Sequence, residues 1–348
     1  MGVKMSDERA FLDYLLINGK NESISSRKED LQLPVWYNEK LFKKGQEYYK
    51  RNLFAMFMGM LCGLIMVLAV PSIRRVLICT NKSSTPRTAY RRYIKTIFHI
   101  LEWHENDLKA NSRAWKSICM VNKVHGAASR LSQSSKCGMI TQKDMVLTQF
   151  GFMGLITLKS KLLGISTNDE FLQSTVHFWR VIGFLMGIED QYNICTDSWE
   201  TTKPRLEIVL HEIYKPFLTT NDSEFLALTD ALIDGLWSFN PFLTSGAFLY
   251  FTKRLAECDG YEYLKSDYPC PEVAEKSDKL YKTLSWYNRF VLCFLIIIHQ
   301  YLYIHTIGRL YYNSQIVLSR FLIYYFPFLA YHRFGWKGSY VRIFKKDH

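Results

Sequence analysis

The chain has 348 residues, of which 48% are hydrophobic and 15% aromatic, and its formal net charge is +12. This apolar content excludes a disordered chain, and folding at this length buries about 75% of the surface of the unfolded polypeptide. The basic residues are interleaved with apolar ones and form no nucleic-acid-binding motif. We therefore expect anionic lipid headgroups or an acidic cofactor as counter-charges, and no nucleic acid.

The first part of the chain combines a polar region with a long apolar segment. Residues 1–50 are mostly polar and charged and do not resemble an ordinary cleavable signal peptide. Residues 53–70 carry no charge, which is the short end of the ~20 residues needed to cross a bilayer. This segment is predicted to be a helix that either spans a membrane or lies buried in the core.

The next predicted helix has two contrasting faces. Ile94, Ile97, Phe98 and Leu101 form an apolar face at helical spacing. A second face places cationic and hydroxyl side chains at i, i+3, i+4 and i+7, namely Arg92, Lys95, Thr96 and His99. Such a face is either solvated surface or one wall of a site for an acidic ligand.

A histidine about thirty residues further on lies in another predicted helix. His125 completes an apolar stripe at i+4, so we expect its imidazole to be buried; the other members of the stripe are Val121, Val124 and Ala128. A buried histidine is either a hydrogen-bonded core residue or a ligand. The small residues that begin at Gly126 favour a ligand, because they let a flat group approach the backbone. Arg130 is placed to meet an acidic edge of that group.

The rest of the chain is also predicted to be nearly all helical. Thr141 and Asp144 form a capping pattern for a helix over residues 142–158, and Asn168 begins the helix that follows. Glycines in these helices, at 151, 154, 183 and 187, are expected where helices cross closely or a cofactor meets backbone. The apolar residues 290–308 and the aromatic-rich residues 310–334 suit either a membrane interface or a helix pair packed on the core.

Four stretches of the chain resemble, in the same order, the mpaB/rubber oxygenase catalytic domain family, whose bacterial members include the latex-clearing proteins. They are residues 92–96 (RYIKT), His125, residues 142–148 (QKDMVLT) and residues 177–190, which begin HFWRVIG and end GIED. The resemblance runs roughly from Leu33 to Cys195. It implies an all-α, multi-helix haem-binding bundle with a globin-like core of the rubber oxygenase type, here with added hydrophobic helices.

The same resemblance implies non-covalent haem b, dioxygen as co-substrate, and oxidative cleavage of a double bond in an isoprenoid or similar apolar substrate. His125 would be the axial iron ligand, with Gly126 and Arg130 as further cofactor contacts. Catalytic residues on the oxygen-binding side would be Arg92, Lys95 and Thr96.

One departure concerns the catalytic base. Latex-clearing proteins carry a glutamate before the arginine, whereas this chain has no Asp or Glu between Glu47 and Glu102. His99 is the nearest candidate replacement, or else a supporting partner of the site. The cofactor is therefore a firmer expectation than the reaction.

We expect three parts: a polar N-terminal region (1–50), a helical oxygenase-like domain (51–285) and an aromatic-rich hydrophobic segment (286–348). The predicted function is a membrane-associated haem oxygenase, located at the endoplasmic reticulum. The alternative is a non-catalytic haem- or lipid-binding membrane protein built on an oxygenase-derived scaffold.

Overall fold

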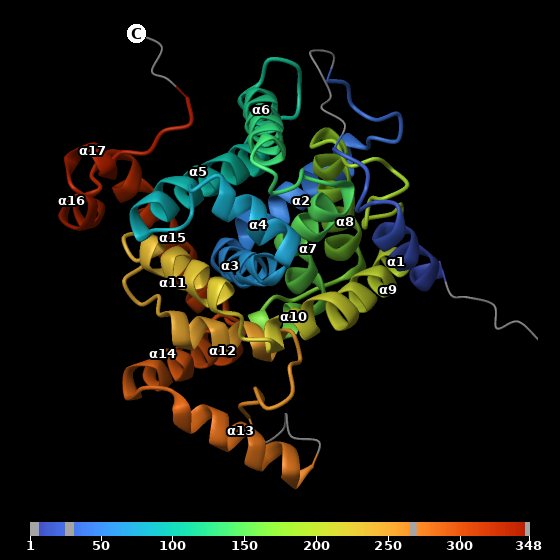
Figure 1. The fold of residues 1–348 in the computed structure, drawn as a ribbon. Helices are drawn as coiled ribbons and strands as arrows, with labels where there is room; N and C mark the ends of the chain where they lie inside the picture. Colours follow the sequence, from blue (N-terminus) through green and yellow to red (C-terminus); the bar gives the residue numbers. More distant parts are fainter. Residues whose placement is uncertain (1–6, 25–30, 265–269, 345–348) are drawn as a thin grey trace, which may run out of the picture.

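The computed structural model describes residues 7–24, 31–264 and 270–344. Over these residues the fold is all-α (Figure 1), and its only β-type pairing is an isolated bridge between Ser23 and Thr141. The multi-helix bundle expected from the sequence is therefore confirmed.

The helices of the first half are α1 (Asp7–Ile17), α2 (Glu39–Arg51), α3 (Leu53–Ala69), α4 (Pro71–Cys79), α5 (Pro86–Glu105), α6 (Arg113–Ser134), α7 (Gln142–Leu158), the 3₁₀ turn η1 (Ser160–Leu163) and α8 (Asp169–Leu185). The second half contains α9 (Trp199–Val209), the π-helical turn η2 (Leu210–Tyr214), α10 (Lys215–Thr219), α11 (Ser223–Leu236), α12 (Ser245–Leu255), α13 (Pro271–Thr283), α14 (Trp286–Ile297), the π-helical turn η4 (Ile298–Leu302), α15 (Thr306–Tyr325), α16 (Phe328–Phe334) and α17 (Trp336–Ser339).

Helix α3 is the centre of the core. It is apolar on all sides, and a helix of this kind is stable only when other elements surround it. Sixteen of its seventeen residues are buried, and α7, α11, α12 and α15 pack around it. Of the two alternatives for residues 53–70, the structure matches the buried core helix.

Two glycines allow α3 and α7 to cross at very short range. A Cβ built on Gly63 would lie 1.8 Å from the carbonyl oxygen of Gly151, and one built on Gly151 would lie 2.5 Å from a methyl of Val67. The expectation of a close crossing at residue 151 is thus confirmed. Gly187, expected inside a helix, instead follows the end of α8 with φ of +92°, where a left-handed residue ends the helix.

The chain turns sharply between α2 and α3. The two helices meet at Asn52 with a bend of 96°. Asn313 of α15 bridges the break, because its Oδ1 accepts a hydrogen bond from Phe54 N (2.9 Å) while its Nδ2 donates one to the Arg51 carbonyl (2.8 Å). The groups that a helix end leaves unpaired are thereby satisfied.

None of the described helices alone has both the length and the apolar character to cross a bilayer. The bent α2–α3 pair meets the length and composition requirement only when its two helices are taken together.

The sequence also predicted how several helices begin. Thr141 and Asp144 form a capping box at the start of α7, and the Asn168 side chain caps α8 by accepting from Phe171 N. Both predictions are confirmed. Helices α1 and α2, from the region expected to be polar, also contribute apolar residues such as Phe11 and Phe42 to the common core.

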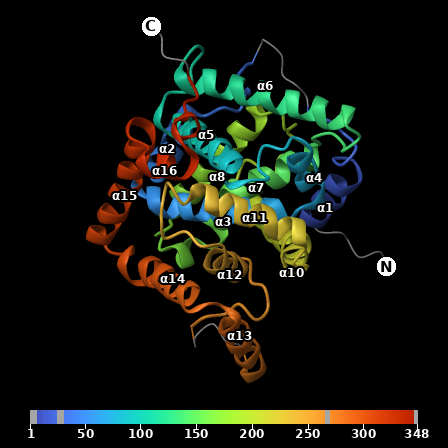
Figure 2. The ribbon, with the colours of Figure 1, turned by 60° about the vertical axis from the view of Figure 1, so that its left-hand side comes forward.

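The C-terminal helices form one side of the molecule. Figures 1 and 2 place α14, α15 and α16 along the same flank. Within it, α14 packs on α12, α15 on α3, and α17 on α5. Twenty of the 27 large apolar side chains that are exposed in the described chain lie between Trp286 and Trp336. We call this set the C-terminal aromatic surface.

The α3–α7 crossing supplies a stability test. Gly63→Ala places a methyl group against the Gly151 carbonyl, and we expect it to lower the free energy of unfolding by about 3 kcal/mol. Urea denaturation followed by far-UV circular dichroism measures the change. Gly126→Ala is the matched control, because a Cβ there meets only the end of Arg130 and helix propensity favours alanine by ~1 kcal/mol. Equal stability of the two variants would contradict the close crossing.

Candidate functional site

Helix α5 carries the cationic face predicted from the sequence. It begins at a capping box formed by Thr85 and Thr88. Its apolar side is buried at Ile94, Phe98 and Leu101 and half-buried at Ile97. On the other face Arg92, Thr96 and His99 are half-buried and Lys95 is exposed. The polar face is therefore not uniformly solvated, and three of its four side chains are partly withdrawn from water.

Helix α6 packs against α5 and α4 and carries His125. The expectation that the imidazole of His125 is buried is confirmed only in part. The imidazole is half-buried, as are Val121 and Ala128, while Val124 is 58% exposed. The reason is that α6 lies on the outside of the bundle and its buried residues are near its two ends, at Ala114, Ser117, Ile118 and Ser132.

The Nδ1 atom of His125 nevertheless lies out of contact with solvent and has no hydrogen-bond partner. Burial, the positive charge of Arg92 and the neighbouring His99 together lower the pKa of His125 to about 4. At neutral pH the ring is therefore uncharged, which is the form of histidine that ligates metals. These interactions also place Arg92 and His99 near His125, so the structure brings the two predicted helices together as one site.

His99 is held by a residue that sequence reasoning missed. The buried hydroxyl of Ser117 on α6 lies 2.7 Å from His99 Nδ1 and accepts a hydrogen bond from Trp103 Nε1 at 2.9 Å. Burial and the charge of Lys95 lower the pKa of His99 to about 4. Ser117 follows Ala114 at i+3 on the buried side of α6, which was the one signal available in the sequence.

The other predicted residues lie as follows. The Thr96 hydroxyl donates to the carbonyl of Arg92 in its own helix (3.2 Å). Arg130 is exposed and folds back along α6, so that its guanidinium is the one group within 4 Å of a Cβ built on Gly126. The backbone at Gly126 therefore has room for at least one methyl group beside it.

No acidic side chain replaces the missing glutamate directly. Glu102, one turn after His99, is the nearest acid along α5, but Arg113 binds its carboxylate with two hydrogen bonds (2.9 and 2.5 Å). Asn106 donates a third, at 2.9 Å. Both carboxylate oxygens of Glu102 are therefore already engaged by hydrogen-bond donors.

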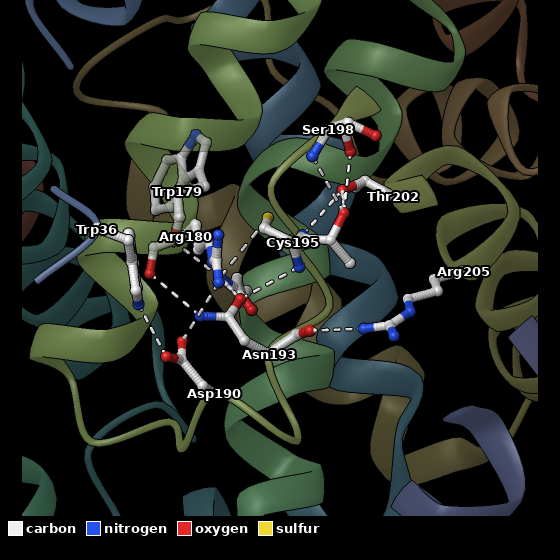
Figure 3. Close-up of polar contacts among 11 residues, drawn as sticks. Trp36, Trp179, Arg180, Asp190, Asn193, Cys195, Ser198, Thr202 and Arg205 are labelled. Atoms are coloured by element: carbon white, nitrogen blue, oxygen red, sulfur yellow. Dashed lines mark hydrogen bonds and ion pairs between the residues drawn. The ribbon is translucent and has the colours of Figure 1, made fainter. Parts of the chain in front are cut away.

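The stretch that begins at His177 has a structural role in the frame around α8 (Figure 3). The Arg180 guanidinium lies 4.0 Å from the ring centre of Trp36, whose Nε1 donates to Asp190 at 2.8 Å. Gln149 of α7 donates to the Trp179 carbonyl (2.8 Å) and to Asn193 (3.0 Å), tying α7 to α8.

A further bond connects this frame to the site. Asn122 of α6, which sequence reasoning also missed, donates to the Leu185 carbonyl at the end of α8 (2.8 Å). This bond lies one turn before His125 and fixes the middle of α6. Because Asn122 binds α6 to the end of α8, the side chains that hold α8 in place also help to position His125.

One feature of His125 is compatible with a haem ligand, namely its unpaired ring nitrogen. Within the described part of the chain no three His, Cys, Asp or Glu side chains gather to hold a metal ion. Haem iron takes four donors from the porphyrin and needs only an axial side chain from the protein. The unpaired, neutral imidazole of His125 can serve as such a side chain.

Acid should destabilise the protein through its buried histidines. The pKa of His125 lies below the ordinary value near 6.5, so the unfolded chain binds the proton first, and stability falls as pH drops from about 6.5 to about 4. The slope of the unfolding free energy against pH is proportional to the number of extra protons that the unfolded chain binds. We expect His125→Gln to reduce this number by about one in this window. Urea titrations of both proteins at several pH values measure the slope. The carboxylates are the same in both proteins, so their effect cancels when one slope is subtracted from the other. Identical slopes in the two proteins would contradict the lowered pKa of His125.

Comparisons with known proteins found one solved structure and one family model that match the chain. A solved structure of latex clearing protein in the closed state matches with a TM-score of 0.48 and 16% sequence identity, over 85% of this chain and 80% of that one. No curated protein matches the chain. A family model described as ER-bound oxygenase mpaB/B'/rubber oxygenase, catalytic domain, matches residues 48–247, which is more than half of the chain. The protein is therefore a member of the mpaB/rubber oxygenase catalytic domain family and an oxidoreductase of the oxygenase type.

Proposed function

We propose that the protein is a membrane-associated, haem b-dependent oxygenase that uses dioxygen to cleave a carbon–carbon double bond of an isoprenoid or lipid-like substrate. The observation that carries the proposal is the pairing of the neutral, unpartnered imidazole of His125 with the cationic face of α5. Membership of an oxygenase family supports the class of reaction.

The haem would be held from α6. His125 would bind the iron, Gly126 would leave the backbone accessible to the ring, and the exposed guanidinium of Arg130 would be available to a propionate. Haem b, when bound, supplies the oxygen chemistry that no side chain provides. The bond from Asn122 to α8 orients the helix that presents His125.

The side chains of α5 would act on the reacting oxygen atoms. Arg92 and Lys95 bring positive charge to this face and Thr96 a hydroxyl, and such groups stabilise negative charge that develops during the reaction. Their partial burial at Arg92 and Thr96 strengthens the effect, because water screens them less.

His99 is our candidate for the proton-holding group. Its pKa of about 4 leaves the ring neutral at pH 7, and Ser117 fixes it through Nδ1. In the tautomer whose Nδ1–H donates to the Ser117 hydroxyl, the other ring nitrogen, Nε2, is free to accept a proton. Glu102 is a weaker candidate because Arg113 and Asn106 already occupy its carboxylate.

A non-catalytic haem- or lipid-binding protein is the second candidate function. The absence of any Asp or Glu between Glu47 and Glu102 favours it, as does the C-terminal aromatic surface. The two candidates differ in whether oxygen is consumed, and not in whether haem binds.

Two variants separate cofactor binding from reaction. We expect His125→Ala to lose the Soret absorbance of the purified protein and its oxygen uptake with an isoprenoid. Lys95→Ala should retain the spectrum and lose at least tenfold in oxygen uptake, because it removes a charge that stabilises the reacting oxygen. Absorption spectra and an oxygen electrode measure both quantities.

His211→Ala is the matched control, since His211 is an exposed histidine outside this site. A Soret band that survives His125→Ala would remove His125 as the iron ligand. Haem binding without oxygen uptake in the unmodified chain would favour the non-catalytic candidate.

Membrane association would use the C-terminal aromatic surface. Contiguous exposed apolar side chains of this extent mark an interaction site, and aromatic residues are typical of the membrane interface. Residues 286–344 include six Lys or Arg and no Asp or Glu. This charge suits the anionic headgroups of a membrane such as that of the endoplasmic reticulum.

Vesicle flotation tests the surface. The double variant Ile307→Ser, Phe328→Ser should lose at least tenfold in binding to vesicles of phosphatidylcholine and phosphatidylserine, because both side chains are more than 65% exposed on this surface. The matched control is Ile17→Ser, Val35→Ser, which removes two exposed apolar side chains from the N-terminal region. Equal loss in both doubles would contradict a dedicated membrane surface.

A further inference from the structure

A large cavity lies on a different side of α5 from the face that carries Arg92 and His99. Its volume is about 840 Å³, and it is enclosed by α5, the start of α6, α15 and the C-terminal residues 343–344. The α5 residues that line it include Phe98 and Leu101, which are turned roughly 120° and 180° around the helix from Arg92. The cavity has the size of a ligand pocket and is separate from the proposed haem site.

The walls of the cavity are mostly apolar and aromatic. Helix α15 contributes Val317, Phe321 and Tyr324. The C-terminal residues are fastened over it by two contacts between cations and rings: the guanidinium of Arg113 lies 4.8 Å from the ring centre of Phe344, and that of Arg342 lies 5.4 Å from Tyr324. These walls suit a long apolar chain.

The lining of the cavity also includes three basic side chains. Arg113, Lys116 and Arg320 line it, and Glu102 is the one acidic residue among the lining side chains. Arg113 neutralises Glu102, while Arg320 is paired with Glu105 outside the lining. Lys116 makes no ion pair within the described part of the chain and is exposed to the cavity's solvent. The cavity therefore holds an excess of positive charge beside an apolar wall.

The cavity opens onto the C-terminal aromatic surface. Val317 and Phe321 belong to both, being 55% and 48% exposed while also lining the cavity. A ligand with an apolar chain can therefore enter from that surface without crossing the core.

We propose that this cavity binds a single-chain amphipathic anion. The apolar chain lies along Phe98, Val317 and Phe321, and the phosphate or carboxylate head lies at Lys116, with Arg113 and Arg320 beside it. A charged head meets charge-assisted hydrogen bonds there, and the chain replaces water on the aromatic wall. The site does not depend on haem or on the oxygenase reaction.

Native mass spectrometry of the full chain in dodecyl maltoside tests the proposal. The probe is n-dodecyl phosphate. The neutral detergent has the same twelve-carbon chain and competes for the apolar wall, so a probe molecule that stays bound does so through its phosphate head. We expect one n-dodecyl phosphate to stay bound. Lys116→Gln should weaken its affinity about tenfold, whereas Lys123→Gln, an exposed lysine two turns further along the same helix and outside the lining, should leave it unchanged.

A second pair of variants tests the cavity itself. Val317→Trp fills the mouth and should abolish the adduct, whereas Leu318→Trp, at an equally exposed neighbour outside the lining, should retain it. Dodecanoate replaces n-dodecyl phosphate in a parallel titration, and tighter binding of one of the two assigns the head as carboxylate or phosphate. An adduct that survives Val317→Trp, or inorganic phosphate that binds as tightly as n-dodecyl phosphate, would overturn the proposal. Circular dichroism verifies that each variant is folded.

Discussion

The contact between α3 and α7 is the constraint on which the bundle depends. Gly63 and Gly151 bring the two backbones so close that neither position tolerates a side chain. This proximity buries a helix that is apolar on every side and leaves room for α11, α12 and α15 to complete its shell. Helices α5 and α8 are positioned by this core, and α6, which carries His125, is fixed in turn by α5 and by the end of α8.

Local chemistry explains which parts of the fold the sequence could predict. The caps of α7 and α8 depend on side chains within three residues of the backbone they bind, and both were predicted. The polar face of α5 could be predicted because its residues recur at helical spacing in the sequence. By contrast, the burial of residues 53–70 depends on whether other helices surround them, and composition cannot distinguish a core helix from a membrane span.

The site was predictable where it depended on pattern and unpredictable where it depended on tertiary packing. Spacing and family resemblance selected Arg92, Lys95, Thr96 and His125, and the structure brings their two helices together. Ser117 and Asn122 were missed because their partners, His99 and Leu185, are 18 and 63 residues away. The stripe through Val124 was misjudged because the helix lies at the periphery, where an apolar pattern need not be covered.

The bridge formed by Asn313 shows that the C-terminal helices are not an appendage. This one amide satisfies the last carbonyl of α2 and an N–H at the start of α3, across more than 250 residues of sequence. Helix α15, which carries the exposed aromatic side chains, therefore completes the innermost helix of the protein. A chain that ended before residue 313 would leave one carbonyl of α2 and one N–H of α3 without this partner, at the point where the chain turns into its core.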